Sequence, residues 1–250
     1  MGQDYYLLIL VFLLIALLYS SAGFGGGSSY LALLALAGVN FYIMRSTALM
    51  CNILVVTGGT VIFIKNRHLE FKDTWPLVVA SVPMAFLGGK WPVTETGFFL
   101  LLGFSLLVAS ILLWIKKTPQ KPVALGNKTL VNIIIGGGIG FLSGLVGIGG
   151  GIFLSPILHF MGWGNAKKIA AAASFFILVN SISGLLGQFY QYSPQIDLNY
   201  AWPLLGAVFI GGQIGSRLAA RRFNPFLIKR ITAILIFVIS IRILWDYLIN

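Results

Sequence analysis

The chain alternates long apolar stretches with short polar connections. We mark ten apolar segments, five in each half, at 5–20, 28–38, 45–64, 75–89, 97–115, 130–146, 152–162, 168–188, 200–216 and 226–248. Their unbroken apolar character predicts helices, because the strands of a membrane barrel would alternate apolar and polar residues. The segments 28–38 and 152–162 reach only about 16 Å as helices, roughly half the hydrocarbon core. They are either tilted spans or half-helices that enter and return.

A glycine motif stands before each of these two short segments. Its copies are Gly23-Phe24-Gly25-Gly26-Gly27 and, 124 positions later, Gly147-Ile148-Gly149-Gly150-Gly151. Further pairs at a similar spacing are Trp75-Pro76 with Trp202-Pro203, Gly88 with Gly215, and Asn52 with Asn180. Matches in the same order predict an internal duplication, with repeats at 1–122 and 123–250 in one membrane domain. A paired break in apolar helices must be buried or line a wet cavity, and it points to a transporter's binding site.

Composition places the chain in a membrane. The residues are 58% hydrophobic and 9% charged, and the mean hydropathy is +0.94. A soluble domain of this length would carry far more charge on its surface. A single cysteine, Cys51, excludes a disulfide framework, and His68 and His159 match no metal motif. We therefore predict an all-α polytopic membrane protein with no metal, no cofactor and no enzymatic activity.

Loop charges predict how the segments are oriented. The net charge of +11 comes mainly from loops at 65–74, 116–128, 167–168 and 217–230. Cytoplasmic loops are enriched in Lys and Arg, so these loops and the central linker are predicted to be cytoplasmic and both termini outside. This pattern requires an odd number of crossings per half, which makes the two repeats inverted. Three crossings plus a re-entrant hairpin satisfy it as well as five. Because the charges lie in short loops, nucleic acid is not an expected partner.

The glycine motifs also suggest chemistry. Each motif precedes a helix, and a helix N-terminus presents unpaired N–H groups that suit an anion. Inversion would bring the two N-termini together near the midplane, with hydroxyl and amide side chains beside them. The candidate substrate-binding residues are Gly23, Gly25, Gly26, Gly27, Ser28, Ser29, Asn52, Gly147, Gly149, Gly150, Gly151 and Asn180. The alternative is that the glycines only permit close packing and the asparagines only join helices. No Asp or Glu lies at the centre of a segment, so a carboxylate proton relay is not evident.

The two glycine motifs in duplicated halves resemble the sulfite exporter TauE/SafE family, also called the 4-toluene sulfonate uptake permease family. The second copy, which continues as Ile152-Phe153-Leu154-Ser155-Pro156, is the closer match. The first departs from it, with Ser28-Ser29 after the glycines. The resemblance covers essentially the whole chain and implies a carrier of sulfur-containing oxyanions or organosulfonates in a prokaryotic plasma (inner) membrane.

The expected function is secondary transport of a small sulfur-containing anion such as sulfite, a sulfonate or thiosulfate. The glycine loops would hold the anion near the midplane while the halves rock around it. The alternatives are a channel-like anion pathway and a membrane subunit that delivers sulfur compounds to a soluble partner. The expected partners are the anion and the lipid bilayer. A homo-oligomer and a soluble partner stay open.

Overall fold

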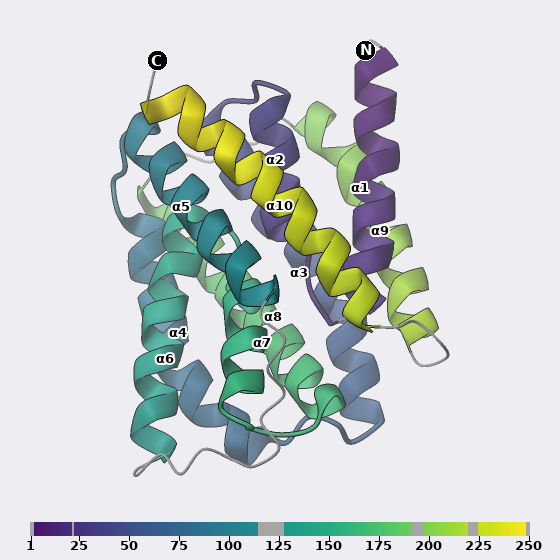
Figure 1. Cartoon of the computed structure of the whole chain (residues 1–250), viewed down its shortest axis with the longest axis vertical. Helices are drawn as coiled ribbons and strands as arrows, with labels where there is room; N and C mark the ends of the chain where they lie inside the picture. The colour runs from purple at the N-terminus through teal and green to yellow at the C-terminus, as the bar shows by residue number, and fades with distance from the viewer. Residues whose placement is uncertain (1–2, 22, 115–127, 192–197, 220–224, 249–250) are drawn as a thin grey trace.

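The computed structural model describes residues 3–21, 23–114, 128–191, 198–219 and 225–248, and every regular element among them is an α-helix (Figure 1). The helices are α1 (Gln3–Ser21), α2 (Gly27–Leu36), α3 (Phe41–Lys65), α4 (Phe71–Lys90), α5 (Glu95–Trp114), α6 (Lys128–Val146), α7 (Gly151–Phe160), α8 (Ala166–Gln191), α9 (Leu198–Ala219) and α10 (Pro225–Leu248). Each predicted apolar segment overlaps one of these helices, most of which begin or end a few residues outside it. The prediction of an all-helical chain is confirmed.

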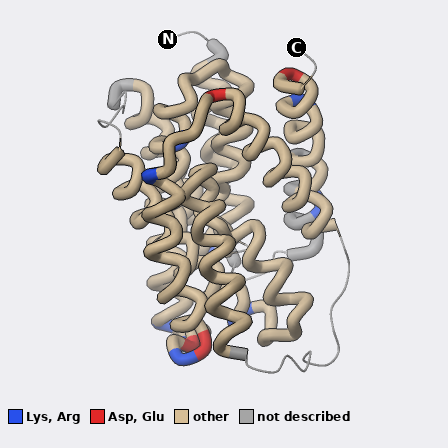
Figure 2. The backbone as a smooth tube through the Cα atoms, turned by 90° about the vertical axis from the view of Figure 1, so that its left-hand side faces the viewer, with Lys and Arg blue, Asp and Glu red and all other residues tan. Residues whose placement is uncertain are grey.

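The outside of the helix assembly is apolar. The helices α3, α5 and α8, with Thr129–Val146 of α6, are long and apolar enough to cross a membrane. Large hydrophobic side chains are exposed along the assembly, among them Leu7, Phe104, Trp202 and Val238. In Figure 2, the Lys, Arg, Asp and Glu residues lie mostly toward the two ends of the helix assembly, and its middle is largely free of them. Lipid is the solvent that such a surface matches.

The helices α3 and α8 pack against each other in antiparallel orientation. Near the start of α3, the Ser46 hydroxyl donates a 3.1 Å hydrogen bond to Gln188 Oε1 near the end of α8. Near the end of α3, Thr60 Oγ1 lies 3.0 Å from Ser174 Oγ near the start of α8. These two contacts fix the register of the pair.

Glycines bring other helices into close parallel packing. Three glycines of α6 face the α4 backbone: Gly136 at Leu77, Gly140 at Ser81 and Gly144 at Ala85. Two glycines of α9 face α1 in the same manner: Gly211 at Leu13 and Gly215 at Leu17. Small residues let helix backbones approach closely in a membrane. Most glycines outside the two motifs are therefore explained by packing.

The helix contacts fix two sets of directions. α9 runs parallel to α3, since Gly212 lies at Val55 and Ser216 lies near Gly59. α8 runs parallel to α4, since Asn180 bonds to Ser81 and, further along both helices, Gly187 lies at Lys90. With the antiparallel pair α3 and α8, the helices α1, α3 and α9 point one way. The helices α4, α6 and α8 point the other way.

The two short helices each cover only half of a long one. Gly27, at the start of α2, lies against Asn52 in the middle of α3, and α2 then leads back to Asn40, which caps α3. Gly151, at the start of α7, lies against Ile177 in the middle of α8. Each short helix therefore returns toward the end at which its long neighbour begins. The segments 28–38 and 152–162 could be tilted spans or half-helices, and this arrangement matches the half-helices.

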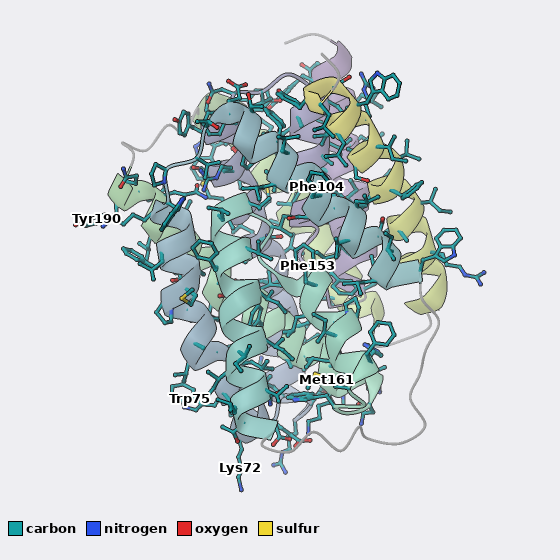
Figure 3. The ribbon with its side chains drawn as sticks, turned by 60° about the vertical axis from the view of Figure 1, so that its left-hand side comes forward. Lys72, Trp75, Phe104, Phe153, Met161 and Tyr190 are labelled. Atoms are coloured by element: carbon teal, nitrogen blue, oxygen red, sulfur yellow. The ribbon has the colours of Figure 1, made fainter. Side chains whose placement is uncertain are left out.

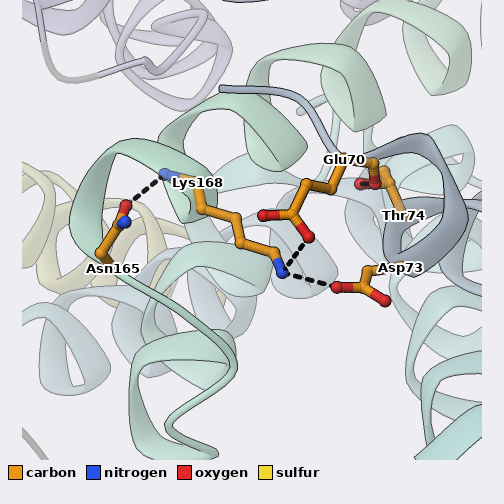
Figure 4. Close-up of polar contacts among 5 residues, drawn as sticks. All are labelled: Glu70, Asp73, Thr74, Asn165 and Lys168. Carbon is orange, nitrogen blue, oxygen red and sulfur yellow. Dashed lines mark hydrogen bonds and ion pairs between the residues drawn. The ribbon is translucent and has the colours of Figure 1, made fainter. Parts of the chain in front are cut away.

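One end of the molecule carries an ion cluster (Figure 4). Lys168 Nζ lies 2.7 Å from Glu70 Oε2 and 2.5 Å from Asp73 Oδ2. This hydrogen bond from Lys168 holds the pKa of Asp73 below its ordinary value. The loop at 65–74 and the start of α8 thus share one end, as the charge pattern predicts, and both termini lie at the other end in Figure 1. The assignment of the ion-cluster end to the cytoplasm stays a prediction.

Candidate functional site

The two glycine motifs form loops with a backbone that favours glycine. Gly26 and Gly150 are the N-caps of α2 and α7, with φ of 87° and 80°. Gly23, Gly147 and Gly149 also have positive φ, between 79° and 84°. Other residues adopt this left-handed region only with strain. The motif is therefore required by the turn that reverses the chain before each half-helix.

The loops of the two halves meet at Asn52. This side chain is fully buried, and its Nδ2 donates a 2.9 Å hydrogen bond to the Ile148 carbonyl in the second loop. A Cβ built on Gly27 in the first loop would lie 2.7 Å from that same carbonyl oxygen. One amide, 96 positions before Ile148 in the sequence, therefore contacts both loops.

The space around this amide admits no further side chains. A Cβ built on Gly25 would overlap Asn52 Oδ1, and one built on Gly149 would lie 2.6 Å from Asn52 Nδ2 and 2.9 Å from Ser181 Oγ. A Cβ on Gly151 would overlap Ile177. The glycines at 25, 27 and 149 thus leave room for the Asn52 side chain, and Gly151 leaves room for that of Ile177.

The remaining motif glycines serve other contacts. Gly23 lies against Ala170 of α8, and Gly147 lies against Arg45 of α3. Arg45 is 1% exposed, its Nη2 lies 3.4 Å from the Gly144 carbonyl, and its guanidinium carbon lies 5.6 Å from the centre of the Phe98 ring. The second loop therefore has a buried positive charge beside it, which adds to the field of the helix N-termini.

The start of each half-helix has N–H groups to offer. In α2, the N–H groups of Ser29 and Tyr30 both donate to the Gly26 carbonyl. In α7, the N–H groups of Phe153 and Leu154 donate to the Gly150 carbonyl in the same way. The N–H groups before them precede the first helical turn and have no carbonyl partner within the helix. Two such ends close to one amide make a suitable environment for an anion.

Buried polar atoms without a partner surround the loops. Asn52 Oδ1, Ser181 Oγ, Ser143 Oγ and the Tyr30 hydroxyl have no hydrogen-bond partner among the described residues. Ser143 and Tyr30 lie beside Gly150 and Gly26, respectively. Leaving a buried polar group unsatisfied costs about 1–3 kcal/mol. Several such groups at one place indicate that a polar ligand or water completes their hydrogen bonds.

The two sides of the site differ in polarity. Ser28 and Ser29 follow the first loop and are buried, and Ser29 Oγ lies 2.6 Å from the Tyr19 hydroxyl. The corresponding residues after the second loop are Ile152 and Phe153, both 6% exposed. The departure from the repeat seen in the sequence therefore makes the first side polar and the second side apolar.

Asn180 lies elsewhere. Its Nδ2 donates to Ser81 Oγ at 3.0 Å and to the Phe176 carbonyl at 2.7 Å, so its described contacts join α8 to α4. The residue of α8 that flanks both Gly25 and Gly149, as Asn52 does, is Ile177. The contacts therefore match Asn52 with Ile177 rather than with Asn180, and they favour helix joining for Asn180.

The candidate residues named from the sequence do not include Ser181, Tyr30 or Ile177. The signal for Ser181 was its position one residue after Asn180, on the face of α8 that α3 covers. Tyr30 stacks on Phe12 of α1, with 4.7 Å between ring centres, and nothing in the apolar pattern distinguishes it from a packing residue. Among the described residues, no three His, Cys, Asp or Glu side chains come together in a way that would hold a metal.

Comparison with known proteins relates this chain to membrane transporters. The model of the family described as "Sulfite exporter TauE/SafE" matches residues 8–243. The "Probable membrane transporter protein y4hK" of Sinorhizobium fredii is 32% identical over 95% of this chain and 97% of its own length. The "Probable membrane transporter protein YjnA" of Bacillus subtilis is 26% identical over 95% of this chain and 98% of its own length. No solved structure matches the chain with statistical significance.

Proposed function

Since the chain belongs to the sulfite exporter TauE/SafE family of membrane transporters, we propose that it is a secondary transporter of a small sulfur-containing anion. Sulfite, a sulfonate, thiosulfate or a related oxyanion is the substrate, and it crosses the plasma membrane by alternating access. The anion binds between the two glycine loops, close to Asn52.

One observation carries this proposal. Two helix N-termini and one buried amide converge at a place where four buried polar atoms have no partner among the described residues. Three of these atoms, the hydroxyls of Tyr30, Ser143 and Ser181, can donate to an acceptor, whereas Asn52 Oδ1 only accepts. With no Asp or Glu at the centre of an apolar segment, these donors suit an oxyanion better than a cation. Sulfur oxyanions carry several oxygens in a tetrahedral or pyramidal arrangement around the sulfur, and these oxygens accept several such hydrogen bonds at once.

The helix directions support an inverted repeat. The first helices of the halves are α1 and α6, the third are α3 and α8, and the fourth are α4 and α9. In each of these pairs one helix belongs to the set that points one way and its counterpart belongs to the opposite set. Inverted repeats with binding at the midplane are a recurring plan among secondary transporters.

The same contacts suggest which bodies move. α1 and α3 pack on α9, while α6 and α8 pack on α4. Each bundle therefore contains helices of both halves, and the α3–α8 contact lies between the bundles. Rocking at this contact would open the site alternately to either end. The moving bodies are then mixed bundles rather than the sequence halves.

The test compares two buried asparagines. Asn52→Asp replaces a donor at the proposed site by a negative charge of the same size, and Asn180→Asp makes the same change against α4. Purified proteins are titrated with sulfite, sulfate, thiosulfate, sulfonates and carboxylates while the melting temperature is recorded, because a ligand that binds only the folded state raises it. We expect one class of sulfur anion to stabilise the wild type and the Asn180→Asp protein but not the Asn52→Asp protein.

Flux measurements in vesicles complete the test. A carrier shows stimulation of uptake by unlabelled anion on the opposite side, whereas a channel shows none. A wild type that neither binds nor moves any sulfur oxyanion would refute the proposal. Equal loss of binding in both aspartate variants would mean that the Asn52 position has no special role.

A further inference from the structure

Polar contacts recur at three levels of the contact between α3 and α8. On α8, Ser174, Ser181 and Gln188 follow one another at seven-residue intervals, which places them about 10 Å apart along the helix. Ser181 is the central one, beside Gly149 and close to Asn52. The other two face Thr60 and Ser46 of α3, toward the ion-cluster end and the terminus end, respectively. Figure 3 shows Tyr190, two residues after Gln188 near the end of α8, far from Lys72 at the ion-cluster end.

Gln188 is the most informative of these residues. Its side chain is 4% exposed, and its Oε1 accepts the hydrogen bond from Ser46. That bond orients the amide, and Nε2 is left with no hydrogen-bond partner among the described residues. A buried primary amide with an unsatisfied donor is costly in an apolar protein interior. A Leu or Met would pack there without that cost, so the donor indicates a ligand.

A positive charge lies on the adjacent position of α3. Arg45 precedes Ser46 and is 1% exposed, and its backbone borders Gly147 of the second loop. Its Nη2 lies 3.4 Å from the Gly144 carbonyl, and Gly144 packs on Gly184 of α8, one turn before Gln188. The guanidinium therefore lies near both the terminus end of the α3–α8 contact and the second glycine loop. In a low-dielectric interior, such a charge strongly favours an anion nearby.

The opposite end of this contact has a different chemistry. Thr60 and Ser174 pair with each other there, and Ser174 also lies 3.4 Å from the Val56 carbonyl. Ser216 of α9 lies beside Gly59, and its Oγ has no partner among the described residues. These contacts involve hydroxyl groups and backbone, without a cationic side chain. The path on either side of the central site is therefore chemically unequal.

We propose that Gln188, with Ser46 and Arg45, forms a second binding position for the transported oxyanion, on the terminus side of the glycine loops. This inference rests on the proposed function. An anion that approaches from the terminus end is held first by Gln188 Nε2 and the field of Arg45, and then passes to the loops about 10 Å deeper. Along the α3–α8 contact from the ion-cluster end, the described groups are the hydroxyls of Thr60, Ser174 and Ser216, so half-saturation from that end requires a higher concentration.

Two substitutions of Gln188 test this position. Gln188→Glu keeps the acceptor for Ser46 but replaces the free donor by a negative charge, and Gln188→Met removes the donor in a side chain of similar length. The matched control is Thr60→Val, which breaks the corresponding α3–α8 hydrogen bond at the other end. Sulfite and thiosulfate fluxes are measured from each face of vesicles, whose orientation is read from labelling of a cysteine introduced at Lys72.

We expect both Gln188 variants to raise the half-saturating concentration from the terminus face by about tenfold or more, as loss of a hydrogen bond to a charged ligand predicts. Thr60→Val should leave this value unchanged. If Gln188→Glu does not fold, Gln188→Met alone decides the outcome. A folded Gln188→Met protein with the wild-type half-saturating concentration from the terminus face would refute the second binding position. The proposal of the central site would then be unaffected. Absence of any flux or binding in the wild type would instead refute the proposed function.

Discussion

A single methyl group at Gly149 should abolish anion binding without unfolding the protein. Gly149 has φ of 84°, and an added Cβ would lie 2.6 Å from Asn52 Nδ2 and 2.9 Å from Ser181 Oγ. Gly149→Ala therefore places a methyl group between the two polar side chains that flank the proposed ligand. The variant tests whether this space is needed for binding or is only a product of close packing.

The structure provides a control for backbone strain. Gly38 also has positive φ, at 66°, but a Cβ added there would meet nothing within 4 Å. Gly38→Ala should thus cost only the left-handed conformation, about 1–2 kcal/mol. Gly149→Ala carries that cost and also displaces the Asn52 amide from its bond to Ile148, worth about 1 kcal/mol. We expect a total loss of about 2–3 kcal/mol for Gly149→Ala.

The assay combines chemical unfolding in detergent with anion titration of the melting temperature. Gly38→Ala should be destabilised yet respond to the anion as the wild type does. Gly149→Ala should be somewhat less stable and show no response. If Gly149→Ala loses no more stability than Gly38→Ala and binds the anion normally, the loops do not enclose the ligand and our reasoning about the site is wrong.

Two further predictions concern packing and pH. Gly140→Leu should prevent folding because a Cβ there lies 2.6 Å from the Cα of Ser81, whereas Gly138→Leu on the same helix has nothing within 4 Å and should fold. The yield of monodisperse protein measures this, and a folded Gly140→Leu protein would contradict the close α4–α6 packing. Lys168→Met should lower stability at neutral pH by removing the bond that depresses the pKa of Asp73. A carboxyl group whose pKa is depressed in the folded state stabilises the fold at pH values above its pKa in the unfolded chain. The difference in stability from the wild type should therefore vanish as the pH falls below about 4. Unfolding measured against pH checks this, and a difference that persists in acid would exclude Asp73 as its source.

The positions of the ten helices could be predicted because long apolar runs carry a strong and simple signal. The direction of the half-helices could not, since a segment such as 28–38 has the same length whether it tilts or returns. Only contacts between segments distant in sequence, such as Gly27 with Asn52, distinguish these alternatives.

The site was predictable to the extent that it depends on backbone. Runs of glycine indicate a backbone with positive φ, as found at Gly26 and Gly150. Single polar side chains in apolar helices form no sequence pattern that would show which of them face the site. Asn52 and Asn180 are therefore equal candidates in the sequence analysis, although of the two only Asn52 contacts the loops. Nor did it distinguish Gln188 from an interfacial residue, because its partner Ser46 lies 142 positions away.

The pairing of α1 with α9 has a consequence for synthesis. Tyr5 at the start of α1 bonds to the Tyr200 carbonyl at the start of α9, 195 positions later. At typical elongation rates of about 5–20 residues per second, α1 waits about 10–40 seconds in the bilayer before its partner leaves the ribosome. For the first part of that time, until the second loop is made 124 positions after the first, the first glycine loop also lacks its contacts with the second. We therefore expect assembly of this protein to depend on protection of the incomplete set of helices, for example by the membrane-insertion machinery, until the last third of the chain is made.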